Sequence, residues 1–401
     1  MEKPGEEERE ATLFIIELFF HSHHRQHPMA NASEAPAFHT INPADRIHPL
    51  LSLQEEHTSI INNLVIHTDA NLKIPHTDFT DFLDRLQGLR KLIIRWNELH
   101  WIGLEEHQLC SFIQLFCLPS LQELYLLGAN NFPLGVLLHF KGRKLCIEGI
   151  ALTSAVMPIF PARVDARELG ALTHLQLNGA QNIREFQMFI EWQKKKAHAF
   201  LQSVSFLQCN IQAREDDVTP EKVMEDLGPF LVTLGSAARC LEEFRFINWQ
   251  NVSFNGPHIT HSDLVSLTSL KRLHLHLGAS HKGKEEKTME TLDASFRIWL
   301  FPFLSNLPSP RLLESVVITF SFFIPFPWPT DLHEWMKILA VDLDTELDRG
   351  FPELRTARLT YNIWGAHTRS YDWKTFNIAL RPSKLNARGV ACTFNTHIHK
   401  P

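Results

Sequence analysis

The chain has 401 residues, of which 44% are hydrophobic and 21% charged, so it can bury a large core. Its formal net charge of −6 is small for this length, and we expect no nucleic acid as a partner. The 6 cysteines show no short paired spacing of the kind that zinc and redox sites use, so we predict an intracellular protein, cytoplasmic or nuclear, with no metal and no cofactor.

Residues 1–40 combine an acidic start, the apolar run TLFIIELFF at 12–20 and a cluster of histidines. The apolar run is too short to span a bilayer, and no basic segment precedes it as in a secretory signal. We expect a disordered or weakly ordered tail over 1–40 and no contact with a membrane.

A short motif, apolar-x-x-apolar-x-apolar, then recurs along the chain. In an extended strand its last two apolar residues point to the same side, and the residue between them points to the other. Two copies extend to the full leucine-rich-repeat signature, one over 89–99 and one over 201–211. The copies are Ile61-Leu64-Ile66, Leu89-Leu92-Ile94, Leu121-Leu124-Leu126, the partial copy Leu145-Ile147, Leu172-Leu175-Leu177, Leu201-Val204-Phe206, Leu241-Phe244-Phe246, Leu270-Leu273-Leu275, Leu313-Val316-Ile318 and Leu354-Ala357-Leu359.

Helical spacing of apolar residues separates many of these copies, and parallel strands need such crossover connections. The predicted helices are Asp78–Leu86, Leu104–Phe116, Ile183–Leu201, Pro220–Leu234, Met289–Leu300 and Leu332–Leu347. The alternation predicts an α/β fold, an irregular leucine-rich-repeat solenoid with a curved parallel sheet on the concave face and helices on the convex face. We place the solenoid over 41–369 and a C-terminal cap over 370–401.

The longest gaps between copies hold polar or proline-rich insertions, one of them Gly278–Lys287, which we expect to be loops on one rim. The part Gly278–Lys284 matches the phosphate-binding pattern G-x-x-x-x-G-K, but Glu285 follows where that loop needs Ser or Thr. His274 and His276 share one face of a strand, as paired metal ligands do. An α/β enzyme that uses this loop or this histidine pair is therefore the alternative function.

No nucleophile elbow, zinc-protease helix or dinucleotide fingerprint is present, so we predict that the chain is not an enzyme. The outward positions of the strands mix aromatic, basic and amide side chains, which suits recognition of another protein. The candidate partner-binding residues are Arg95, Tyr125, Gln176, Arg245, Arg272, His274 and His276.

Three segments, LPSLQELYLLGANNFP at 118–133, LTHLQLNGA at 172–180 and SLKRLHLHLGA at 269–279, make the chain resemble the repeat region of fungal F-box proteins of the mushroom-forming group. The resemblance spans 45–380 and implies a protein-interaction scaffold, the substrate-recognition part of an F-box-type ubiquitin ligase receptor. The implied partners are the adaptor of an SCF-type ligase and a substrate protein. No stretch ahead of the repeats shows the Leu-Pro-x-Glu start of an F-box, so a decayed repeat protein with no retained partner stays open.

Overall fold

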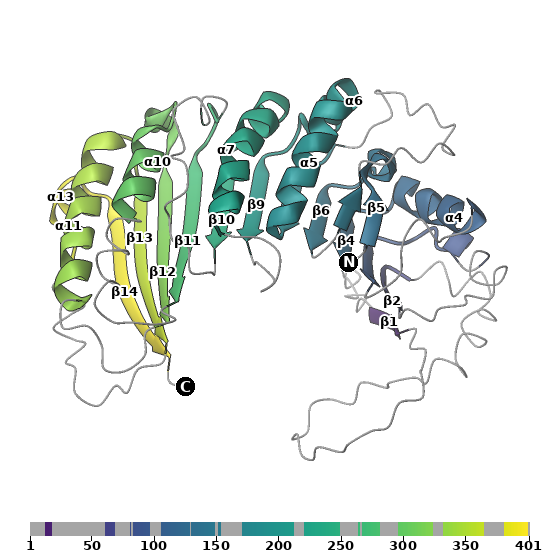
Figure 1. The fold of residues 1–401 in the computed structure, drawn as a ribbon, viewed down its shortest axis with the longest axis horizontal. Coiled ribbons are helices and arrows are strands. Elements are labelled where there is room, and N and C mark those ends of the chain that lie inside the picture. Colours follow the sequence, from purple (N-terminus) through teal and green to yellow (C-terminus); the bar gives the residue numbers. More distant parts are fainter. Residues whose placement is uncertain are drawn as a thin grey trace, which may run out of the picture. The chain divides into compact units, whose positions relative to one another are not determined.

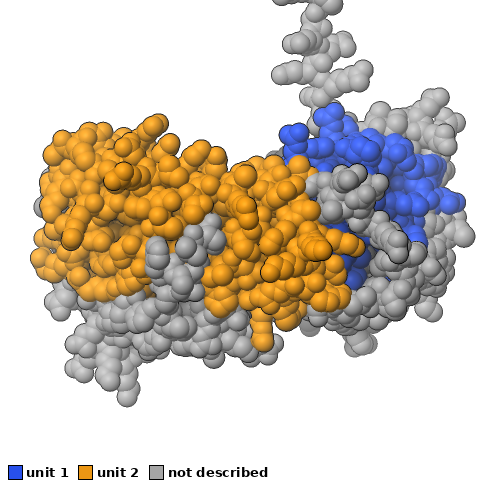
Figure 2. All heavy atoms as spheres, turned by 90° about the horizontal axis from the view of Figure 1, so that it is seen from above, with its two compact units in different colours: residues 1–170 blue, residues 171–401 orange. Residues whose placement is uncertain are grey.

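The computed structural model describes residues 13–17, 61–68, 81, 83–96, 106–128, 130–148, 151–153, 171–211, 220–248, 264, 267–280, 296–323, 332–364 and 381–399. The chain divides into two compact units, residues 1–170 and residues 171–401, which Figure 2 shows in blue and orange. Within the described part of the chain, no helix is both long and apolar enough to cross a lipid bilayer.

The described residues of the first unit form parallel strands that neighbour one another in sequence order, together with one long helix (Figure 1). A separate pair, β5 (Asn130–Pro133) and β7 (Ala151–Thr153), is also parallel. The sheet strands are β1 (Leu13–Glu17), β2 (Asn63–Thr68), β3 (Lys91–Trp96), β4 (Glu123–Leu127) and β6 (Lys144–Glu148), and the helices are α4 (Glu106–Cys117) and the 3-10 helix η3 (Leu134–His139).

The second unit repeats this design over a longer run of parallel strands, again in sequence order. Its strands are β8 (His174–Asn178), β9 (Phe206–Ile211), β10 (Glu243–Asn248), β11 (Arg272–Ser280), β12 (Ser315–Phe323), β13 (Thr356–Trp364) and β14 (Ala391–His399). Its helices are α5 (Ala180–Trp192), α6 (Lys194–Leu201), α7 (Pro220–Ala237), the π-helix η6 (Phe296–Leu300), α10 (Phe301–Ser305), the 3-10 helix η7 (Pro310–Leu312), α11 (Leu332–Gly350) and α13 (Ser383–Ala387).

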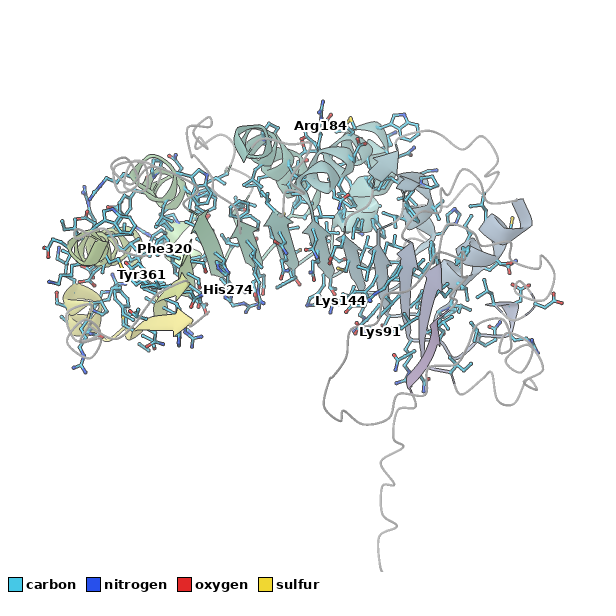
Figure 3. All side chains as sticks on the ribbon, turned by 60° about the horizontal axis from the view of Figure 1, so that its bottom comes forward. Lys91, Lys144, Arg184, His274, Phe320 and Tyr361 are labelled. Atoms are coloured by element: carbon cyan, nitrogen blue, oxygen red, sulfur yellow. The ribbon has the colours of Figure 1, made fainter. Side chains whose placement is uncertain are left out.

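The apolar motif residues of the second unit lie side by side on neighbouring strands. Leu175 pairs with Leu207, Leu207 with Phe244 and Phe244 with Leu273, and none of them has an exposed side chain. This row faces the helices, which lie on one face of the sheet in Figure 3. The α/β class and the parallel pairing of the strands are therefore confirmed.

Aromatic contacts join this apolar face of the sheet to the helices that cover it. The rings of Phe246 in β10 and Trp299 in η6 lie 5.5 Å apart, and Phe244 and Phe303 of α10 lie 6.5 Å apart. The hydroxyl of Tyr361 in β13, itself fully buried, donates to the carbonyl of Met336 in α11 at 3.2 Å. Burial of such large rings contributes strongly to the core of the second unit.

The predicted register of one full-signature copy, Leu201 to Ile211, is wrong by three residues. Leu201 ends helix α6, Val204 takes the first motif position, and the strand places Leu207 and Cys209 in the core. Phe206, predicted to be buried, stands on the opposite side of β9 and is partly exposed. The shift arises because a helix end and a strand both supply apolar residues at the spacing of the motif.

The rim-loop prediction for Gly278–Lys287 is wrong for its first residues. Gly278, Ala279 and Ser280 continue β11 and pair with Ser321, Phe322 and Phe323 of β12, and 281–287 lie outside the described residues. Two further differences concern single elements. The helix predicted over 183–201 is two helices that meet at Gln193, and Leu13–Glu17, inside the expected tail, form β1 and pair with β2.

The last described segment supplies an element that the repeat pattern did not predict. Helix α13 leads into β14, which pairs along all of its length with β13. Its residues Cys392 and Phe394 pair with Ala357 and Leu359, so β14 continues the motif register with residues that the leucine-based pattern does not match. The interpretation of 370–401 as a cap remains a prediction.

Candidate functional site

The side chains that alternate with the buried motif residues form the outward face of each sheet, the face away from the helices. On the first unit this face includes Arg95 of β3 and Tyr125 of β4. On the second unit it includes the remaining candidates, which come from β8, β10 and β11. These are Gln176, Arg245, Arg272, His274 and His276.

In the first unit, Tyr125 lies between two lysines from the neighbouring strands. The amino groups of Lys91 and Lys144 stand 4.8 and 5.1 Å from the centre of its ring. The Tyr125 hydroxyl donates to the carboxylate of Glu123 at 2.8 Å, and Glu123 also lies 3.8 Å from Lys144. Tyr125 therefore makes its described contacts with residues of its own unit, and burial raises the pKa of its hydroxyl.

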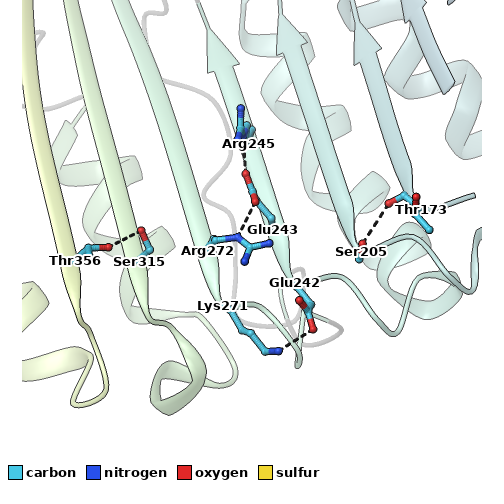
Figure 4. Close-up of polar contacts among 9 residues, drawn as sticks. All are labelled: Thr173, Ser205, Glu242, Glu243, Arg245, Lys271, Arg272, Ser315 and Thr356. Atoms are coloured by element: carbon cyan, nitrogen blue, oxygen red, sulfur yellow. Dashed lines mark hydrogen bonds and ion pairs between the residues drawn. The ribbon is translucent and has the colours of Figure 1, made fainter. Parts of the chain in front are cut away.

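The centre of the second unit's outward face is a carboxylate held by two arginines (Figure 4). Glu243 accepts hydrogen bonds from Nε of Arg245 and Nε of Arg272, both at 2.7 Å. Burial alone would raise the pKa of the Glu243 carboxyl, but the two arginines outweigh that effect and hold the pKa below its ordinary value. Glu243 therefore stays ionised and fixes the direction of both guanidinium groups.

Similar polar pairs link neighbouring strands where the strands begin. Ser205 donates to the carbonyl of Thr173 at 3.4 Å, Lys271 to Glu242 at 2.7 Å, and Thr356 to Ser315 at 2.8 Å. Figure 4 shows them with the Glu243 cluster. Cross-strand pairs of this kind help to fix the register of the strands, which in turn aligns the outward side chains.

An aromatic contact extends the Glu243 cluster toward β8. The guanidinium carbon of Arg245 lies 5.0 Å from the centre of the Phe206 ring, and the rings of Phe206 and His174 stack at 5.2 Å. Phe206 is a site residue that the sequence did not identify, because the wrong register placed it in the core. A continuous surface of contacting side chains therefore crosses β8, β9, β10 and β11.

His274 occupies the middle of this surface, beside Arg245 in the register of the sheet. Burial lowers the pKa of its ring, and the positive charges of Arg245 and Arg272 lower it further. The negative charge of Glu243 opposes part of this effect. Arg358 of β13 contributes to the same lowering, so it belongs to the same electrostatic environment. At neutral pH the ring is uncharged, and the arginines supply the positive charge of the face.

His276 contacts a serine, and this pair most resembles the catalytic pair that the enzyme hypothesis requires. Its Nε2 lies 2.8 Å from Oγ of Ser321, to which Asn362 also donates at 3.4 Å. A histidine and a serine at this distance have the geometry of a base and a nucleophile. However, Ser321 has no exposed surface, so a substrate cannot reach its oxygen, and burial lowers the pKa of His276 to about 4.

The two sites of the alternative enzyme function gain no support from the geometry. Within the described residues, no group of three or more histidine, cysteine, aspartate or glutamate side chains could hold a metal ion. A phosphate-binding loop would have to follow the strand, but Gly278 to Ser280 are part of β11. All 6 cysteines are free thiols.

A hollow of about 450 Å³ lies at the far edge of the second unit, between α13 and β14. It is lined by Arg381, Pro382, Asn386, Cys392, Thr393, Phe394 and Asn395. Burial raises the pKa of the Cys392 thiol to about 11, so the thiol is protonated at neutral pH and a poor nucleophile.

No family model matches the chain, and no curated protein matches it. Among solved structures it is similar to a structural-genomics protein from Bacteroides fragilis, with 8% identity and a TM-score of 0.31, over 87% of this chain and 68% of that one. It is also similar to a sugar phosphate isomerase/epimerase from Parabacteroides distasonis, with 9% identity and a TM-score of 0.21, over 73% of this chain and 83% of that one. At these TM-scores neither likeness carries an argument about function.

Proposed function

We propose that the chain is a protein-interaction scaffold of the leucine-rich-repeat class and that it binds its partner on the outward face of the second unit. The observation that carries this proposal is the alignment of outward side chains from successive parallel strands. Gln176, Gln208, Arg245 and His274 occupy one row, because each pairs with the next across the sheet. A row of fixed side chains on a rigid sheet offers a partner several contacts at little entropic cost.

The composition of this face supports binding rather than mere exposure to water. It combines the ring of Phe206, the aliphatic Ile247 and the amides of Gln176 and Gln208 with charged groups at its centre. Protein interfaces favour such a mixture of aromatic residues and arginines with polar neighbours.

Two matched variants test the location of the binding surface. Gln208→Trp adds a bulky ring in the middle of the outward face, whereas Val341→Trp adds the same ring on α11, where Val341 is 60% exposed. We expect cross-linking to capture the partner proteins with wild type and with V341W, but not with Q208W. Binding measured with purified components then verifies each partner. Equal capture by all three proteins would contradict the proposed surface.

The substrate-recognition role in an F-box-type ubiquitin ligase is a narrower proposal, which rests on the resemblance of the repeats. Its test is direct binding of the purified full chain to the adaptor subunit of an SCF-type ligase, measured by calorimetry. Saturable binding would support the ligase role. If the adaptor does not bind but another partner binds at the outward face, only the scaffold function is supported.

A further inference from the structure

The outward face of the second unit carries more positive than negative side chains. Among the described outward positions of β8 to β14 the charged residues are three arginines, Arg245, Arg272 and Arg358, and one glutamate, Glu243. The face is therefore positive, although the whole chain has a formal net charge of −6. A concentration of one sign on one face attracts a ligand of the opposite sign.

The guanidinium groups keep donors that no described residue uses. Arg245 and Arg272 bind Glu243 only through Nε, and their side chains are 40% and 48% exposed. Their terminal amino groups make no hydrogen bond to any described residue. Arg358 is exposed and has no ion pair or hydrogen bond within the described part of the chain. Carboxylates can therefore approach donors that are already oriented.

The spacing of the arginines indicates the kind of acidic ligand. Arg245, His274, Val317 and Arg358 form one row across β10, β11, β12 and β13. Neighbouring strands lie about 4.8 Å apart, so the two end arginines are separated by about 14 Å, the length of four or five extended residues. One phosphate group cannot contact both ends of such a row. An extended peptide with carboxylates at both ends can.

We propose, on the basis of the scaffold function above, that this arginine row binds an extended acidic segment of the partner protein that crosses β10 to β13. One carboxylate binds Arg245 and Arg272, a second binds Arg358, and an apolar residue between them lies over Val317. Glu243 is a positioning residue that orients the first two guanidinium groups. The ligand is thus recognised by charge at two points and by the distance between them.

The experiment measures binding of fluorescein-labelled peptides to the full chain by fluorescence anisotropy. The probe peptide has two glutamates four residues apart around a central valine, and its matched control has glutamines in their place. We expect the glutamate peptide to bind at least about tenfold more tightly, and increased salt to weaken that binding. Equal binding of the two peptides overturns the proposal.

Arginine variants with a matched control locate the site. Arg245→Gln and Arg358→Gln should each weaken binding about fivefold to tenfold. Arg349→Gln, which removes an exposed arginine from the last turn of α11, should leave binding unchanged. Because Arg358 has no partner in the described structure, its replacement should leave the thermal melting curve unchanged, which separates loss of binding from loss of folding. Equal effects of R358Q and R349Q contradict the proposal.

Two further measurements distinguish the possible failures. Displacement of the glutamate peptide by millimolar inorganic phosphate, at a concentration where sodium chloride of equal ionic strength leaves the peptide bound, would show that the arginines bind a single anion, and it would overturn the two-point model. If neither arginine variant affects a natural partner that Q208W loses, the scaffold proposal stands and the acidic-segment proposal fails. If Q208W loses no partner and the glutamate peptide does not bind, both proposals fail.

Discussion

Glu243 shows how one residue can serve both the stability and the surface chemistry of the sheet. It is 7% exposed, and its carboxylate lies between two arginines on adjacent strands. Replacement by glutamine removes the charge and leaves one neutral carbonyl oxygen where the carboxylate offers one oxygen to each guanidinium group. A group of this kind is expected to contribute more than a pair that is fully in water.

We therefore predict that Glu243→Gln lowers the free energy of unfolding by about 1–3 kcal/mol at pH 7. The matched control is Glu242→Gln, because Glu242 pairs with Lys271 at 2.7 Å with side chains 39% and 41% exposed. We expect the control to lower the free energy of unfolding by less than about 0.5 kcal/mol. Urea unfolding monitored by circular dichroism measures both values, and equal costs would contradict the special role of Glu243.

The same variant has a predicted pH dependence. Because the pKa of Glu243 in the folded chain lies below its ordinary value of 4.5, its contribution is complete above that pH. The contribution is lost as pH falls through the lowered folded value. The difference between wild type and E243Q should therefore shrink below about pH 4.5. A difference that stays constant down to pH 3 would mean that the glutamate charge does not matter.

His276 should also reduce stability as pH falls, but over a higher pH range than Glu243. Its pKa is lowered from 6.5 to about 4 by burial, so the unfolded chain binds a proton between these values and the folded chain does not. Stability should therefore fall by about 2 kcal/mol as pH drops from 6.5 to 4, an amount reduced by the partial exposure of the ring.

The variant that tests this is His276→Gln, which can still hydrogen bond with Ser321 but does not titrate. Its unfolding free energy should fall less than that of wild type between pH 6.5 and pH 4. Gln208→Ala, a change of a neutral residue on the same face, should reproduce the wild-type pH dependence. Parallel curves for wild type and H276Q would exclude His276 as a source of acid sensitivity.

At the scale of elements, a buried carboxylate of α11 caps α13, the last described helix of the second unit. Asp344 of α11 is 4% exposed and accepts hydrogen bonds from the backbone amides of Ser383, Lys384 and Leu385 at 2.9, 2.9 and 3.0 Å. These amides open helix α13, where no turn of the helix itself can satisfy them. Asp344 thus caps a helix that is distant in sequence.

We predict that Asp344→Ala lowers the unfolding free energy by about 1–3 kcal/mol and loosens α13 before the rest of the unit. Hydrogen exchange should become faster at the amides of α13 and of β14, which follows it. Glu346→Ala is the control, because Glu346 is on the same helix and makes no hydrogen bond or ion pair with the described residues. Uniformly faster exchange across the whole unit would contradict a local capping role.

Most strands could be predicted from the sequence because inward residues such as Leu92, Leu124 and Leu273 are leucines with no exposed surface. The motif failed where other residues take these positions. Cys392 and Phe394 of β14 pair in register with the apolar residues of β13, but they do not match a leucine pattern. At β9 the last residue of helix α6 matched the apolar spacing of the motif, because that spacing alone does not indicate where the backbone changes from helix to strand.

The candidate site was only partly predictable for a related reason. Alternation along one strand predicts which side a residue faces, so Arg245, Arg272 and His274 could be chosen. Contacts between strands depend on register, which a single sequence does not give. The bridge from Glu243 to both arginines, the stacking of Phe206 on Arg245 and the row that ends at Arg358 therefore emerge only from the structure.

At the scale of the whole molecule, the second unit contains every group that the binding proposals use. The arginine row, Glu243, Phe206 and the helices behind them all lie within residues 171–401. This unit also has a core of its own, with fully buried residues from β8 to β13, among them Leu175 and Tyr361. In the repeat architecture that we propose for the chain, stability is approximately a sum of contributions from each repeat and from its neighbours.

We therefore predict that residues 171–401, produced alone, fold and unfold in one cooperative transition when followed by circular dichroism in urea. The fragment should bind the glutamate probe peptide with a Kd within about twofold of that of the full chain, because no residue of the arginine row is removed. Arg358→Gln in the fragment should weaken binding as it does in the full chain. A fragment that lacks a cooperative transition, or that exposes its core to a hydrophobic dye, would show that the second unit needs residues 1–170 to fold.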